Sequence, residues 1–82
     1  MKLNWQPYNG DPESLPAVFI GEFAYGVSKT LTPDVLLARW DDTQDSFVDS
    51  SGDELNLGVT QYLARYAEID DPDVLRAFGV DA

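Results

Sequence analysis

The stretch VLLARWDDTQDSFVD, residues 35–49, decides which fold the sequence predicts. It fits a hairpin, with a buried strand up to Asp41, a turn up to Asp45, and a returning strand after it. The same region also fits a helix over 33–40, because the Thr-Pro-Asp sequence at 32–34 suits an N-cap and the first helical positions. We favour the strand and keep the helix as the alternative.

The segments before this hairpin predict further strands. Residues 17–24 are rich in strand formers, with Gly21 as a bend or bulge, and residues 27–31 are a candidate partner strand. Three prolines exclude a helix from the first sixteen residues. We therefore expect irregular structure there, with one short strand around Leu3 and Trp5.

The C-terminal region predicts two helices. Four apolar residues recur at the spacing of one helical face: Val59, Tyr62, Leu63 and Tyr66. A second, shorter helix follows, with Asp71 as its N-cap, Pro72 as its first residue and Gly79 at its end.

Together these elements predict an α+β fold, in which a small antiparallel sheet is followed by two short C-terminal helices. No linker or low-complexity tract interrupts the chain, so residues 1–82 are expected to form a single compact domain. The sequence PDVL occurs at 33–36 and again at 72–75, which is the best argument for a helix at the earlier position.

The composition excludes several classes of chemistry. The chain has no Cys and no His, so thiolate nucleophiles, Cys/His zinc sites and a Ser-His-Asp triad are excluded. Gly52 does not stand at the spacing that an EF-hand loop needs. We expect no enzyme activity, no cofactor and no metal. No apolar run is long enough for a membrane span or a secretory signal, so we expect a cytoplasmic protein, with a monomer favoured.

The negative charge is strong and unevenly distributed. Fifteen acids against five bases give a formal net charge of -10. Residues 41–82 hold eleven acids and two bases, a net of -9, whereas residues 1–40 are almost neutral. Direct binding to nucleic acid is unfavourable for such a chain, but a basic nucleic-acid-binding protein should attract it.

Two clusters of acids are the candidate partner-binding residues. The first contains Asp41, Asp42, Asp45, Asp49, Asp53 and Glu54, and the second contains Glu68, Asp70, Asp71 and Asp73. If Asp45, Phe47 and Asp49 share one face of a strand, their spacing of about 6.6 to 6.8 Å matches every second phosphate of a nucleic-acid strand. The alternative is that the acids form a solvated turn that serves solubility.

With these two acidic clusters, the absence of Cys and the small size, the chain resembles the acidic anti-CRISPR proteins that phages encode. The resemblance covers the whole chain but includes no diagnostic motif. It implies a non-enzymatic inhibitor that acts as a nucleic-acid mimic. Its partner would be a basic nucleic-acid-binding protein, such as the CRISPR surveillance complex Cascade.

A second hypothesis assigns the binding to aromatic residues. Trp5 and Tyr8 lie in polar surroundings in the sequence, and exposed aromatic side chains often anchor protein interfaces. The chain would then be an acidic phage accessory protein that binds its partner through an apolar or aromatic patch.

Overall fold

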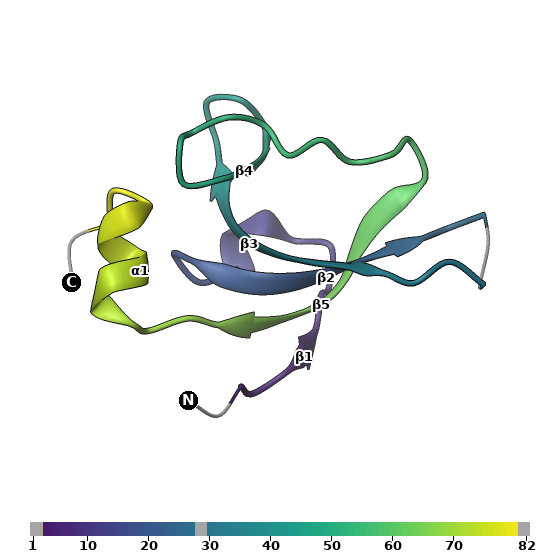
Figure 1. Ribbon diagram of the computed structural model, residues 1–82, viewed down its shortest axis with the longest axis horizontal. Coiled ribbons are helices and arrows are strands. Elements are labelled where there is room, and N and C mark those ends of the chain that lie inside the picture. The colour runs from purple at the N-terminus through teal and green to yellow at the C-terminus, as the bar shows by residue number, and fades with distance from the viewer. Residues whose placement is uncertain (1–2, 28–29, 81–82) are drawn as a thin grey trace.

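The protein is a curved antiparallel sheet with one short helix at its end (Figure 1). The computed structural model describes residues 3–27 and 30–80. The strands are β1 (Gln6–Pro7), β2 (Phe19–Tyr25), β3 (Asp34–Asp41), β4 (Ser46–Val48) and β5 (Gln61–Glu68). A 3-10 turn, η1 (Pro12–Ser14), precedes β2, and the helix α1 (Pro72–Ala77) follows β5.

The strand order is β1-β5-β2-β3-β4, and all neighbouring strands are antiparallel. Two predictions are confirmed. The first is the hairpin that we favoured over a helix, which β3 and β4 form. The strand predicted at residues 17–24 corresponds to β2. The strand expected at 27–31 is not formed by its described residues, and residues 28 and 29 lie outside the described part. β3 pairs with β2 in its place.

The prediction of two C-terminal helices is wrong, because residues 61–68 form the strand β5 rather than a helix. The described chain is mostly β, with α1 and η1 as its helical elements. In the register with β2, Glu22 pairs with Arg65 and Phe23 pairs with Leu63, so Ala64 is an extra residue in β5. A bulge of this kind reverses the alternation of side chains along a strand.

The bulge explains why β5 imitates a helical pattern. It places Leu63 and Tyr66, three residues apart, on the same face of the sheet, where both pack in one apolar cluster. Val59 and Tyr62, the other two members of the expected helical face, are exposed. The expected helical face is therefore wrong, and the spacing of Leu63 and Tyr66 results from an irregular strand.

Each sheet face carries a separate apolar cluster. On one face, the buried residues Phe19, Phe23, Ala38 and Leu63 pack against partly buried side chains from the loops and from β3, β4 and β5. The ring of Phe47 packs edge-to-face against Phe19 and Phe23, with centroids 5.9 and 5.6 Å apart. This ring fixes β4, the shortest strand of the hairpin, to the core.

On the other face, α1 covers one end of the sheet (Figure 1). The core there contains Val18, Ile69 and Phe78. Asp71 caps the helix by accepting hydrogen bonds from the backbone N–H groups of Asp73 and Val74, and Gly79 has φ 75° just beyond the helix. The predicted cap and end of this helix are thus confirmed.

Candidate partner-binding surface

The first acidic cluster lies mainly in two turns on either side of β4, and we call residues 41–54 the acidic double turn. Asp41 closes the first turn, because its carboxylate accepts hydrogen bonds from the backbone N–H and the hydroxyl of Thr43, at 2.9 and 2.6 Å. Asp42 accepts a hydrogen bond of 2.7 Å from the indole Nε1 of Trp40. Two of the acids are therefore held in fixed positions beside the end of β3.

The second turn is closed in the same way by Asp49. Its carboxylate accepts hydrogen bonds from the backbone N–H groups of Ser51 and Asp53, at 2.9 and 3.1 Å. Gln44 joins the two turns, since its side-chain amide donates to the carboxylate of Asp41 at 3.1 Å and to the carbonyl of Gly52 at 2.9 Å. The double turn is consequently one hydrogen-bonded unit.

The remaining three acids of this cluster project into solvent. Asp45, Asp53 and Glu54 are exposed, and no side-chain hydrogen bond or ion pair within residues 3–27 and 30–80 involves them. Asp45 has φ 53°, a left-handed conformation that Asp tolerates better than most residues. Asp45 and Asp49 flank β4 and do not lie on it, so the regular ladder of carboxylates that we expected along that strand is not formed.

Hydrogen bonds decide the ionisation of Asp41. The hydroxyl of Thr43 and then its backbone N–H hold the pKa of the Asp41 carboxyl below its ordinary value, with smaller contributions from Gln44 and Arg39. The Arg39 guanidinium is 4.0 Å from this carboxylate. The one opposing effect on this pKa is desolvation of the carboxyl, and the donors of the turn outweigh it.

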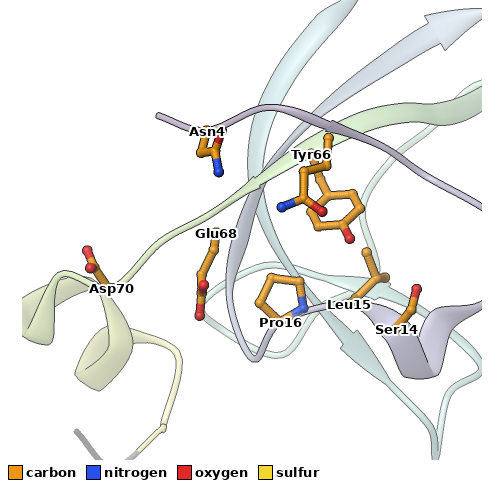
Figure 2. Close-up of a pocket in the computed structure, with 8 residues that line it drawn as sticks. Asn4, Ser14, Leu15, Pro16, Tyr66, Glu68 and Asp70 are labelled. Atoms are coloured by element: carbon orange, nitrogen blue, oxygen red, sulfur yellow. The ribbon is translucent and has the colours of Figure 1, made fainter. Parts of the chain in front are cut away.

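The second acidic cluster is divided between structural and unengaged residues. Asp71 caps α1, and Asp73 forms an exposed ion pair with Arg76. Glu68 and Asp70 are exposed and line a pocket beside β5 (Figure 2). Figure 1 shows the start of α1, where this cluster lies, and the turns next to β4 in different parts of the fold.

The aromatic residues of the second hypothesis are packed against other side chains. The ring of Trp5 lies under the Arg65 guanidinium, with 4.5 Å between its centroid and the guanidinium carbon. Tyr8 packs edge-to-face against Phe47 and Tyr66, with centroid distances of 6.5 and 6.4 Å. Neither ring is among the large apolar side chains that the structure leaves exposed.

The exposed apolar side chains of the sheet were not predicted from the sequence. Val35 and Leu37 in β3 and Tyr62 in β5 are 53%, 41% and 54% exposed. Val35, Leu36 and Leu37 are all apolar, so the sequence alone does not show which of them is exposed. Thr43 and Gln44 were not predicted either, although their position between acids is typical of a hydrogen-bonded turn.

Within residues 3–27 and 30–80, no group of three or more acidic side chains is placed to hold a metal ion. In the same ranges, no helix has the length and apolar character of a membrane span. No protein-family model, no curated protein and no solved structure matches this chain. Any functional assignment must therefore come from the surfaces themselves.

Proposed function

We propose that this protein is a non-enzymatic inhibitor that acts in the cytoplasm by covering a basic nucleic-acid-binding groove of another protein. The binding surface is the acidic double turn. The observation that carries the proposal is the arrangement of its carboxylates, because Asp41, Asp42 and Asp49 are held by turn hydrogen bonds while Asp45, Asp53 and Glu54 project freely.

A rigid acidic surface suits this task for an energetic reason. Binding is weakened when side chains and loops must become ordered, and a loop that is already hydrogen-bonded loses less entropy. The carboxylates of the double turn still have free lone pairs, so each can accept charge-assisted hydrogen bonds from Lys or Arg. The carboxylates are thus grouped in two neighbouring turns and do not follow the regular spacing of phosphates along a nucleic-acid strand.

The negative charge of the acidic double turn should increase the rate of association with a basic partner. Within residues 41–54 there are six acids and no base. Such a single-sign field steers a protein toward a basic groove, and its effect declines as salt increases. The resemblance to acidic anti-CRISPR proteins supports a CRISPR surveillance complex such as Cascade as the first partner to test.

The test compares two double variants with the same change of charge. D53K/E54K reverses two exposed acids of the double turn, and E68K/D70K reverses two exposed acids beside β5. Binding to the complex is measured by surface plasmon resonance at several salt concentrations. We expect D53K/E54K to raise Kd about tenfold or more, because the lost attraction is replaced by repulsion.

The control variant E68K/D70K should change Kd by much less than D53K/E54K does. Equal weakening by both variants would show that net charge alone matters and that the double turn is not the binding surface. If neither variant changes Kd, the acidic surface has no role in binding, and the exposed side chains of Val35, Leu37 and Tyr62 become the surface to test.

A further inference from the structure

We propose that the pocket beside β5 binds a guanidinium group, carried either by an arginine side chain of a protein or by a free arginine-like molecule. The pocket lies between the β1–β5 edge of the sheet and the segment that contains η1 (Figure 2). It is separate from the acidic double turn, so it is a second site and does not depend on the proposed function.

The pocket has the dimensions of a site for one small polar group. Its volume is about 390 Å³, at the lower end of the range for small-molecule sites. In Figure 2, Tyr66 and Glu68 extend from β5 on the same side, toward Leu15 and Pro16. Asp70 stands at the rim, where β5 leads toward α1.

The lining combines acceptors with apolar walls. The carboxylates of Glu68 and Asp70 are joined by the side-chain amides of Asn4 and Gln6, whose carbonyl oxygens can accept hydrogen bonds. The ring of Tyr66 supplies an aromatic wall, which attracts a cation. Among the described residues, none that lines the pocket is basic, so its carboxylates favour a cation over an anion.

Glu68 and Asp70 differ from the other acids near α1 in having no partner. Asp71 is occupied by the helix cap and Asp73 by Arg76. By contrast, no hydrogen bond or ion pair in the described part of the chain engages the carboxylates of Glu68 and Asp70. Glu68 therefore contributes one unengaged carboxylate to the pocket, and Asp70 contributes a second at its rim.

A guanidinium fits this set of groups better than an ammonium. It has five N–H donors in one plane and binds carboxylates in a bidentate manner, and it also stacks on aromatic rings. An ammonium has three donors around a single point and is more strongly hydrated. The several acceptors around the pocket therefore match the larger, planar cation.

The test is an NMR titration of the full chain with the capped peptide acetyl-Gly-Arg-Gly-amide and, separately, with free arginine. We expect saturable shifts confined to the amides of residues 4–6, 14–15 and 66–70. The peptide with citrulline in place of arginine, which has almost the same shape without the charge, should produce none. Stronger binding of the peptide than of free arginine would identify a protein side chain as the source, and the reverse a free molecule.

Two matched variants separate a site from general attraction. E68Q/D70N removes two charges from the pocket, and D53N/E54Q removes the same two residue types from the acidic double turn. We expect the first to weaken arginine binding about tenfold and the second to leave it nearly unchanged. Both pairs are exposed, so both variants should keep the wild-type NMR spectrum outside the mutated sites.

Equal weakening by the two variants, or shifts distributed over all acidic residues, would overturn the proposal. Binding of the citrulline peptide as strong as that of the arginine peptide would overturn it as well. These outcomes leave the proposed function of the double turn unaffected, because that function is measured with a different partner and different variants.

Discussion

Among the single residues, Asp41 is an acid with a structural role, because its carboxylate holds the first turn together. Its carboxylate accepts three hydrogen bonds from Thr43 and Gln44, and these lower its pKa. A carboxyl whose pKa is lower in the folded state than in the unfolded state stabilises the protein when it is ionised. This contribution is complete at neutral pH and is lost as pH falls through the lowered pKa.

The prediction concerns the variant Asp41→Asn. At pH 7 its Tm should be lower than that of the wild type by several degrees, because the amide is a weaker acceptor for these donors. As pH falls below about 4, where carboxyls become protonated, the difference between the two proteins should shrink. Thermal unfolding followed by circular dichroism between pH 7 and pH 2.5 measures both effects.

Asp53→Asn is the control, because no side-chain hydrogen bond in the described part of the chain engages Asp53. Its Tm should follow that of the wild type across the pH range. A difference between wild type and Asp41→Asn that stays constant with pH would contradict the role assigned to the ionised carboxylate.

At the scale of elements, β5 shows which part of the fold the sequence predicts and which part it does not. The cap, first residue and end of α1 could be predicted, because Asp71, Pro72 and Gly79 act through local backbone geometry. β5 could not, because the bulge at Ala64 is recognisable only when the pairing with β2 is known. A helix and a bulged strand place Leu63 and Tyr66 on one face equally well.

The candidate site also combines parts that neighbouring residues encode with parts that depend on contacts between residues distant in the sequence. The turns at 42–45 and 49–53 are encoded by neighbouring residues, and both are present in the structure. The position of Phe47 in the core, which removes the expected ladder of Asp45 and Asp49, depends on contacts with β2. The pocket of Glu68 and Asp70 depends on η1, more than fifty residues earlier, so no local pattern reveals it.

Gly21 in β2 provides a prediction about the packing between strands. A Cβ at this position would come within 2.8 Å of the Leu63 Cδ1 atom and within 3.0 Å of the Phe23 ring. Gly21→Ala should therefore reduce the free energy of unfolding by about 1 to 3 kcal/mol, as overpacking does in other cores. Urea denaturation measures this change.

Gly58→Ala is the matched control, because a Cβ there would approach no atom closer than 3.5 Å, the Gln61 Oε1 atom. It should change the free energy of unfolding much less than Gly21→Ala does. Equal stability of Gly21→Ala and the wild type would show that β5 does not lie against β2 as described.

At the scale of the whole molecule, the net charge of -10 is distributed over a body of 38 × 30 × 20 Å. The Debye length is about 30 Å at 0.01 M salt and about 8 Å at 0.15 M. At the lower concentration, acids across nearly the whole molecule therefore repel one another, and at the higher concentration only near neighbours do. The three ion pairs involving Arg39, Arg65 and Arg76 are at or near the surface and offset little of this repulsion.

We therefore predict that Tm increases when salt is raised from about 0.01 to 0.15 M. The increase should be smaller for a variant with fewer negative charges, such as D53N/E54Q. Differential scanning calorimetry at several salt concentrations measures the effect. A Tm that falls with salt would mean that attractive pairs outweigh repulsion in the folded protein.

The proposed function requires the acidic double turn to occupy a groove that otherwise binds nucleic acid. The most direct measurement is displacement of fluorescently labelled DNA from Cascade by this protein, followed by fluorescence anisotropy. We predict stoichiometric displacement that weakens as salt increases, with D53K/E54K unable to displace the DNA and E68K/D70K still able to do so. DNA that stays bound at saturating concentrations of the wild-type protein would contradict inhibition of this complex by mimicry.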